Sequence, residues 1–150
     1  MSISIRRATA SDLTSLVSFN QSMALETEDK PLDEALLSAG VNRVLSSEDK
    51  GFYLVAEAEG DVIGSLMVTF EWSDWRNATF WWVQSVYVVP QWRRKGVYSA
   101  LYQQVQSLAQ TAEGVCGYRL YVEKDNLVAQ ATYKKLGMDE SHYLMFEQKS

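Results

Sequence analysis

Apolar residues recur along the chain at two spacings, one typical of strands and one typical of helices. Residues 2–7 alternate polar and apolar side chains, which predicts a first strand. Leu13, Leu16 and Phe19 follow at helical spacing and predict a first helix. Pro31 starts a second helical pattern after an acidic connection, because proline is favoured in the first turn of a helix. We therefore expect a strand followed by two helices in this part of the chain.

The middle of the chain is rich in strand-forming residues. Residues 52–59 and 62–70 are two strand-like runs separated by Gly60-Asp61, which predicts an antiparallel hairpin. Residues 78–89 are apolar or aromatic at most positions, which is typical of a strand covered on both faces. We expect this strand to lie at the centre of the sheet.

The last third of the chain returns to alternating helices and strands. Apolar residues near the 3.6-residue period predict a helix over 97–112, and a strand over 118–122 follows it. A further helix over 126–136 is closed by Gly137, because glycine is favoured just after a helix ends. A final strand is predicted over 142–148. The interleaved order indicates an α/β fold.

Length and composition narrow the class of protein. At 150 residues the chain suits one domain with a sizeable core, so we expect a single domain over residues 1–150. No apolar run reaches the ~20 residues that cross a bilayer and no signal peptide is evident, so we expect a cytoplasmic protein without a membrane partner. The net charge of -5 argues against a nucleic-acid partner. No cluster of His, Cys, Asp and Glu has metal-ligand spacing, so we expect no metal.

A basic turn stands between the long apolar strand and the helix that follows it. Pro90 ends the strand, and Arg93, Arg94, Lys95 and Gly96 lead into the helix. The first turn of a helix has unpaired backbone N–H groups and partial positive charge, which together favour a bound anion. The basic side chains could add charge-assisted hydrogen bonds. The sequence therefore predicts a phosphate site here, and an ordinary turn with a solvated basic cap is the alternative.

The same turn carries a family motif. Arg93-x-x-Gly96-x-Tyr98, after a Val-x-Val-x-Pro strand end, resembles the coenzyme A binding motif Arg/Gln-x-x-Gly-x-Gly/Ala of the GCN5-related N-acetyltransferases, the GNAT family. Tyr98 departs from this motif, because its last position normally carries a small residue. The departure raises the question of how closely a pyrophosphate can approach the helix start.

A second signature of that family is matched downstream. In it a strand is followed by an Asn, an Ala and an aromatic residue in a short helix; here these are Asn126, Ala129 and Tyr133, followed by Leu136-Gly137-Met138. The resemblance covers essentially the whole chain. It implies the GNAT fold, a mixed, mostly antiparallel central sheet with a splayed parallel strand pair and flanking helices. It also implies acetyl-CoA as the co-substrate.

The resemblance assigns roles to residues of this chain. The residues expected to bind the cofactor are Val86, Tyr87, Val88, Arg93, Arg94, Lys95, Gly96, Val97, Tyr98, Asn126 and Tyr133. Tyr133 takes the place of a hydroxyl beside the thioester sulfur and is the candidate general acid, since a phenol with a pKa of ~10 is protonated at neutral pH. Core packing is the alternative for this side chain. A backbone N–H on the strand edge at 86–88 is expected to stabilise the thioester oxygen.

The acceptor side of the expected site has no evident general base, although an attacking amine must be neutral. The family often holds a carboxylate on the strand at 78–89, where this chain has none. Glu71 and Asp74 are the candidate catalytic carboxylates, in a predicted loop whose tryptophans would suit a cation. The residues expected to bind the substrate are Glu26, Glu28, Glu71, Trp72, Asp74, Trp75 and Gln84. A solvated hairpin at 71–76, and a solvated acidic surface around Glu26 and Glu28, are the alternatives.

Three functions fit these observations to different degrees. The first is an N-acetyltransferase that moves the acetyl group of acetyl-CoA to a primary amine of a small molecule, amino acid or peptide, by direct attack in a ternary complex. The second is a non-catalytic acyl-CoA binding sensor or partner module, suggested by Tyr98 and by the missing strand carboxylate. The third, a nucleic-acid binder that uses Trp92 and the basic turn, is disfavoured by the acidic chain. The aromatic content is also compatible with a homodimer.

Overall fold

The computed structural model describes residues 2–150, and its backbone forms two compact units. The first unit ends at Leu120 and contains the β-sheet, and the second comprises Tyr121–Ser150. The single domain expected over residues 1–150 stays a prediction.

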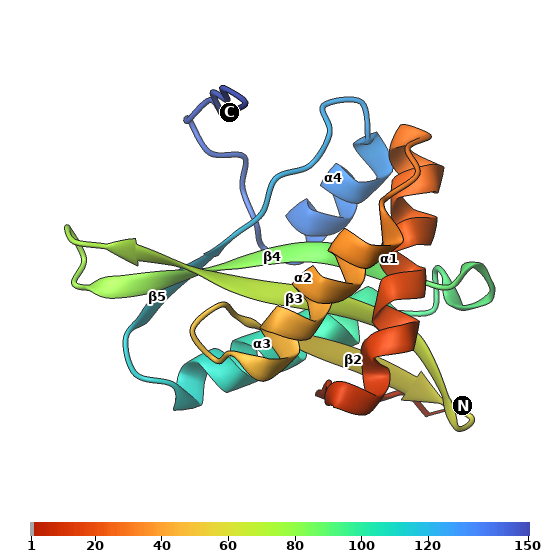
Figure 1. Ribbon diagram of the computed structural model, residues 1–150. Coiled ribbons are helices and arrows are strands. Elements are labelled where there is room, and N and C mark those ends of the chain that lie inside the picture. The colour runs from red at the N-terminus through yellow and green to blue at the C-terminus, as the bar shows by residue number, and fades with distance from the viewer. Residues whose placement is uncertain (1) are drawn as a thin grey trace. The chain divides into compact units, whose positions relative to one another are not determined.

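Five strands within residues 2–120 form one sheet in the order β1-β2-β3-β4-β5 (Figure 1). They are β1 (Ser4–Arg7), β2 (Phe52–Ala58), β3 (Asp61–Ser73), β4 (Ala78–Val88) and β5 (Val115–Arg119). Neighbouring strands from β1 to β4 pair antiparallel, and β4 pairs parallel with β5. The expected mixed, mostly antiparallel sheet is confirmed. Its central strand is β3, so the prediction that the strand at 78–89 lies at the centre is wrong.

The parallel strands β4 and β5 pair over only part of their length. The pairing runs from Thr79 opposite Val115 to Trp82 opposite Arg119, whereas β4 continues to Val88. Within the described residues, β4 has no pairing with β5 beyond Trp82. One edge of β4 is therefore free of its neighbour in its second half, as expected for a splayed parallel pair. β5 begins earlier than the sequence predicted.

Helices cover both faces of the sheet in the first unit. They are η1 (Ala10–Asp12), α1 (Leu13–Glu28), α2 (Glu34–Ser46), η2 (Pro90–Trp92) and α3 (Val97–Thr111). α1 and α2 lie in front of the sheet in Figure 1, and α3 lies behind it. Buried Tyr53 and Val55 of β2 pack with Leu16, Val17 and Val41 of α1 and α2. No helix among residues 2–150 is both long and apolar enough to cross a membrane.

Both hairpins differ in detail from the sequence prediction. The β2–β3 turn is Glu59-Gly60 rather than Gly60-Asp61, and its two residues have φ values of 55° and 82°. Two positive φ values are those of a type I′ turn, which matches the twist of the flanking strands. β3 continues to Ser73, so Glu71 lies in a strand instead of the predicted loop.

The second unit contains α4 (Leu127–Lys135). The Asn126 side chain caps this helix by accepting a hydrogen bond from the Ala129 backbone N–H at 3.1 Å. Gly137 follows the helix with φ 97°, as expected for a glycine that ends one. The strand predicted over 142–148 is wrong, because none of these residues is in a strand. A strand needs a paired neighbour, and the second unit supplies none.

Candidate functional site

A β-bulge interrupts β4 just after its pairing with β5 ends. Tyr87 lies opposite Ser65 and Gln84 lies opposite Met67, so β4 carries one residue more than β3 between these pairs. Ser85, in the bulge, has a φ of 52°, which is uncommon for a residue with a side chain. Because the neighbouring strand has diverged here, backbone N–H groups on that edge of β4 are available to a ligand.

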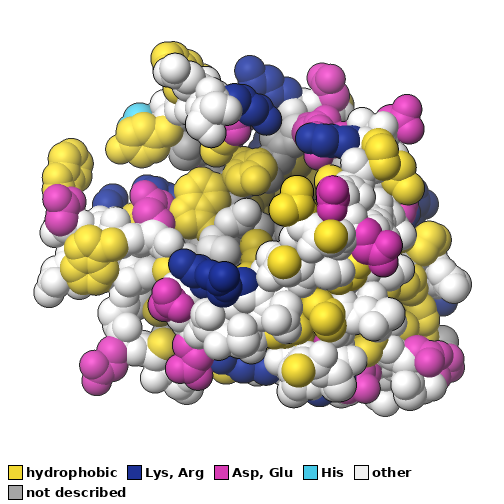
Figure 2. All heavy atoms as spheres, in the orientation of Figure 1, with side chains coloured by type: hydrophobic (Ala, Val, Ile, Leu, Met, Phe, Trp, Pro, Cys, Tyr) yellow, Lys and Arg dark blue, Asp and Glu magenta, His cyan; other side chains and the backbone are white. Residues whose placement is uncertain are grey.

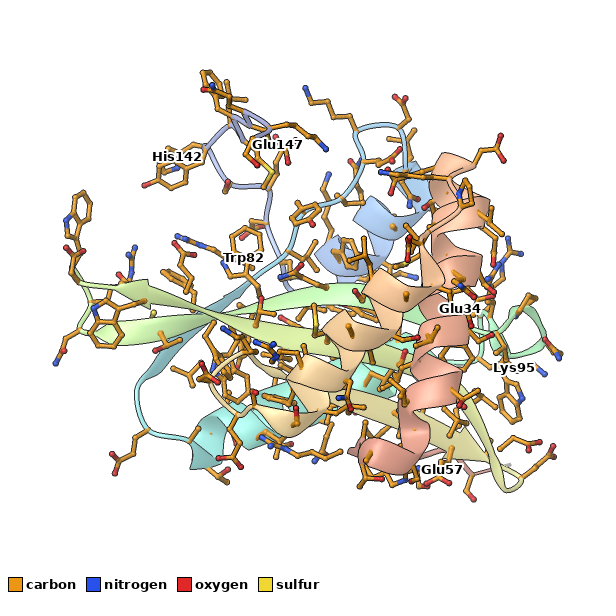
Figure 3. All side chains as sticks on the ribbon, viewed as in Figure 1. Glu34, Glu57, Trp82, Lys95, His142 and Glu147 are labelled. Atoms are coloured by element: carbon orange, nitrogen blue, oxygen red, sulfur yellow. The ribbon has the colours of Figure 1, made fainter. Side chains whose placement is uncertain are left out.

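The basic turn leads from β4 into α3 through two residues in the left-handed region. Arg94 has a φ of 64°, and Gly96, the N-cap of α3, has a φ of 80°. A Cβ built on Gly96 would meet nothing within 4 Å, so glycine is favoured here by backbone conformation and not by crowding. The N–H groups of the first helical turn have no acceptor within the helix, which suits a phosphate. Figure 3 shows Lys95 in this turn, beyond the end of β4.

The side chain of Arg93 is held by the protein on two sides. Its Nε donates to the Val88 carbonyl at 2.8 Å, and its Nη2 donates to Glu26 Oε1 at 2.7 Å. The guanidinium also lies 5.4 Å from the ring centre of Tyr87. Arg93 therefore fixes the basic turn against β4 and α1. The groups of this turn that could bind a phosphate are Arg94, the backbone, and Lys95, whose Nζ lies 5.2 Å from the ring centre of Trp92.

Tyr98, the large residue at the small position of the motif, lies in an aromatic row. Its ring stacks on that of Tyr102 with a centroid separation of 6.0 Å and an interplanar angle of 16°. Tyr102 in turn meets Tyr118 of β5 edge-on at 5.8 Å. The row runs along the side of α3 that faces β5. The Tyr98 ring is thereby packed against the next turn of α3.

A pocket of about 210 Å³ lies beside the free edge of β4. It is lined by Met23, Glu26 and Thr27 of α1, by Val86, Tyr87 and Val88 of β4, and by Arg93. The pocket thus brings together several residues predicted to bind cofactor with one predicted to bind substrate. Glu28, two residues after Glu26, is exposed and does not line it.

Glu26 joins α1 to the strand and to the basic turn. Its carboxylate accepts hydrogen bonds from Arg93 and from the Tyr87 hydroxyl, the latter at 2.8 Å. The Arg93 hydrogen bond, and then that of Tyr87, lower the pKa of Glu26, so the carboxylate is ionised at neutral pH. Its role in the structure is to hold two groups at the pocket rather than to accept a proton.

Replacing Glu26 with Gln should weaken acetyl-CoA binding about two- to fivefold, because a half-exposed ion pair contributes ~1 kcal/mol or less. The amide removes the charge that holds Arg93 while it can still accept the Tyr87 bond. Calorimetric titration with acetyl-CoA measures the change. Glu28→Gln is the matched control, since Glu28 makes no hydrogen bond or ion pair with the described residues. Tighter binding by Glu26→Gln would show that the ion pair keeps Arg93 from the ligand.

Polar side chains on β3 and β4 are joined diagonally across the sheet face next to the bulge. Gln84 Nε2 donates to Thr69 Oγ1 at 2.6 Å, and Trp82 Nε1 donates to Glu71 Oε1 at 2.8 Å. Arg119 of β5 donates to the same Glu71 oxygen at 2.8 Å. Trp82 stands on β4 in Figure 3. Trp82 and Arg119 are not among the residues predicted from the sequence. Trp82 lies two residues from Gln84 along a strand and so on the same face, which is a signal that could have identified it.

The candidate base Glu71 is a weak proton acceptor in this setting. The Trp82 hydrogen bond lowers its pKa most, and the hydrogen bond and charge of Arg119 and the charge of Arg76 lower it further, against the opposing effect of burial. A general base works best with a pKa near the operating pH. Glu71 is therefore better suited to orient Trp82 and Arg119 than to remove a proton.

The other residues of the predicted acidic site lie toward the tip of the β3–β4 hairpin. Asp74 accepts a hydrogen bond from the Trp75 backbone N–H at 2.9 Å, as in a local turn. Trp72 and Trp75 are 63% and 87% exposed. Among the described residues, the indole that donates a hydrogen bond to Glu71 belongs to Trp82 and not to Trp72 or Trp75. This geometry favours the solvated-hairpin alternative for Trp72, Asp74 and Trp75.

The predicted general acid Tyr133 and its neighbour Asn126 lie in the second unit. Burial raises the pKa of Tyr133, so its hydroxyl keeps its proton at neutral pH. Asn126 uses its side-chain oxygen as the cap of α4. Among residues 2–150, no group of three or more His, Cys, Asp and Glu side chains could hold a metal ion.

Solved structures share this fold over nearly the whole chain. The crystal structure of a possible acetyltransferase from Clostridium difficile 630 is 44% identical with a TM-score of 0.91, and the match covers 99% of this chain and 97% of that one. A predicted acetyltransferase with acetyl-CoA from Clostridium acetobutylicum is 18% identical, with a TM-score of 0.81 and coverages of 97% and 96%. AAC(6')-Iy, solved with the bisubstrate analog CoA-S-monomethyl-acetylneamine, is 20% identical, with a TM-score of 0.78 and coverages of 100% and 99%. The last two show likeness of fold alone.

A search of curated proteins returned no match. A comparison with models of protein families did return one. The model of the Acetyltransferase (GNAT) family matches residues 13–138. This span includes the bulge in β4, the basic turn, the start of α3 and α4. Because the match covers well over half of the sequence, the chain belongs to the GNAT family of acetyltransferases.

Proposed function

We propose that the chain transfers the acetyl group of acetyl-CoA to a primary amine of a small molecule, amino acid or peptide, by direct attack in a ternary complex. The observation that carries the proposal is the continuous run from the β4 bulge, past the pocket, to the start of α3. This run offers backbone N–H groups at the free edge of β4 and again at the helix start. A long ligand with a polar arm and a pyrophosphate needs hydrogen-bonding groups at both places.

Successive parts of acetyl-CoA suit successive segments of the first unit. The free edge of β4 at Val86 to Val88 lies along the pocket and suits the amide groups of the pantetheine arm. The first turn of α3, with Arg94 and Lys95 before it, suits the pyrophosphate. A backbone N–H at the bulge would stabilise the charge that develops on the thioester oxygen, a contribution of about 3 to 4 kcal/mol in other enzymes. Acetyl-CoA itself supplies the acyl group as a thioester.

The amine must lose a proton before it attacks, because an alkylammonium with a pKa of ~10.4 is mostly charged at pH 7. Gln84, which precedes the bulge in β4, has no basic group, and Glu71 has a lowered pKa. We therefore place water as the first proton acceptor, with Gln84 and Thr69 as groups that orient it. Tyr133 donates a proton to the departing thiolate. Asp74 stays a second candidate base.

The alternative is an acyl-CoA binding module without catalysis, favoured by the lack of a carboxylate on β4. Tyr98 no longer favours it, since its ring lies against Tyr102. A nucleic-acid binder would need a continuous basic surface. On the face shown in Figure 2, Lys and Arg side chains are instead interspersed with Asp and Glu.

Release of free thiol from acetyl-CoA in the presence of a panel of amines tests the proposed function. The panel should contain amino acids, short peptides, diamines and aminoglycosides, and calorimetry should measure acetyl-CoA binding in parallel. We expect micromolar binding and thiol release with at least one class, with the acetylated product seen by mass spectrometry. Binding without any transfer would favour the non-catalytic module. Absence of binding would contradict both functions.

A further inference from the structure

Two arginines contact the same aromatic ring, that of Phe80, which lies in β4 on the hairpin side of the bulge. The guanidinium carbon of Arg119 lies 3.6 Å from the ring centre of Phe80, and that of Arg76 lies 5.0 Å from it. The ring sits against the backbone of Gly117, where an added Cβ would come within 2.9 Å of it. Glycine in β5 thus makes room for Phe80, and the ring supports both guanidinium groups.

The positive charge at this ring is only partly balanced. Glu71 uses one oxygen, Oε1, for both Trp82 and Arg119. Arg76 donates to the neutral Ser73 hydroxyl at 3.3 Å, and no carboxylate within residues 2–150 pairs with it. The nearby Asp74 bonds the backbone at the hairpin tip. Two guanidinium groups therefore share one paired carboxylate, which leaves N–H donors for a second anion.

The two arginines lie beside the same strand, β4, that carries the bulge at which acyl transfer is expected. Trp82, opposite Arg119, is three residues before Ser85 in β4, and Phe80 is five residues before it. At a rise of ~3.3 Å per residue, these positions lie ~10 to ~17 Å from the bulge. Phe80, Trp82 and Gln84 alternate along one strand and so share one face. α1 and α2 lie over the other end of this sheet in Figure 1, away from the β3–β4 hairpin.

We propose that the acceptor of this enzyme is a short peptide, or a molecule of similar length, whose amine reacts at the bulge while its terminal carboxylate binds Arg119 and Arg76. A peptide of about three to five residues spans ~10 to ~17 Å when extended. The inference rests on the proposed function, and it narrows the acceptor from any primary amine to one that carries an anion at its far end.

The test compares peptides that differ only at the far end. Acetyl transfer to tetraglycine is measured beside tetraglycine amide, which lacks the carboxylate, and beside the same peptide ending in a trimethylammonioethyl amide, which carries a fixed cation and no second primary amine. For the wild-type protein we expect kcat/KM for the free acid to exceed that for the amide about tenfold, since a charge-assisted pair is at stake. Arg119→Gln should remove this preference by raising KM for the acid alone.

Arg7→Gln is the matched control, because the guanidinium of Arg7 also stacks on a phenylalanine, Phe52, at 4.2 Å. Phe52 packs against Trp81, whose side chain points to the opposite face from that of Phe80. Arg7→Gln should keep the wild-type preference for the peptide acid over the peptide amide. Equal rates for acid and amide, or preference for the cationic peptide, would overturn the inference. Transfer to other amines without an acid preference would leave the proposed function standing.

A binding experiment covers the case in which turnover is too slow to measure. Protein saturated with coenzyme A is titrated by calorimetry with tetraglycine and with its amide. Tighter binding of the acid that Arg119→Gln abolishes would support the inference without any chemistry. Equal binding of the two peptides would overturn it, whereas failure to bind coenzyme A would contradict the proposed function instead.

Discussion

Gly96→Glu is expected to weaken acetyl-CoA binding about a hundredfold or more, which corresponds to ~2.7 kcal/mol. Gly96 caps α3 with a φ of 80°, a conformation that residues with side chains rarely adopt. A Cβ at this position meets nothing within 4 Å, so the new side chain would extend into the space proposed for the pyrophosphate. Its carboxylate would repel the phosphates and compete for the same N–H groups. Calorimetric titration with acetyl-CoA measures the loss.

Gly114→Glu separates this effect from backbone strain. Gly114 has a φ of 71°, and a Cβ there also meets nothing within 4 Å. It follows α3 instead of preceding it, so the same substitution adds similar strain and the same charge away from the proposed site. We expect the control to bind acetyl-CoA within about threefold of wild type, although both variants lose some stability. Equal loss in both variants would contradict a phosphate site at Gly96.

The elements whose positions could be predicted are those whose apolar pattern is long and regular. The apolar run at 78–89 predicts β4, and the helical period over 97–112 predicts α3; both elements are present. The basic turn between them was evident because strand, turn and helix start are adjacent in sequence. Local signals of this kind need no knowledge of which strands become neighbours.

Features that depend on neighbouring strands could not be predicted in the same way. The bulge is a mismatch of register between β3 and β4. Ser85 has a positive φ there, and nothing in the local sequence predicts it. The lowered pKa of Glu71 requires Trp82 and Arg119, which come from two other strands. The neighbours of Glu71 in the chain predict an acidic loop, because they include Asp74 and no basic partner before Arg76. The partners that lower the pKa of Glu71 are brought to it by strand pairing between residues far apart in the chain.

The strand wrongly predicted over 142–148 has a related cause. Its apolar and aromatic residues favour a strand, but a strand exists only with a partner for its backbone N–H and C=O groups. Tyr143, Leu144, Met145 and Phe146 are all more than half exposed. Strand-forming residues show that a segment is able to form a strand; they do not show that a neighbouring strand is available to pair with it.

Tyr133→Phe is expected to lower kcat about a hundredfold, the scale of a single acid–base contribution, while leaving the Kd for acetyl-CoA within about twofold. Burial raises the pKa of Tyr133, so the phenol stays protonated across neutral pH and can give its proton to the departing thiolate. The raised pKa also sets the pH dependence, because loss of the proton donor occurs only as the pH rises above the ordinary phenol range. Steady-state rates of thiol release from pH 6 to pH 10 measure the fall in kcat, and we expect the wild-type rate to show no loss of the proton donor within this range.

Tyr143→Phe is the matched control for the loss of one hydroxyl in the second unit, since Tyr143 is 64% exposed. We expect the control to keep its kcat within about twofold. A Tyr133→Phe variant with nearly normal kcat would favour the packing role, because the phenyl ring that packs is retained and only the hydroxyl is removed. A thioester with a more acidic leaving thiol provides a further check. Such a substrate needs less help from an acid, so it should restore much of the rate of Tyr133→Phe and should change wild-type kcat less.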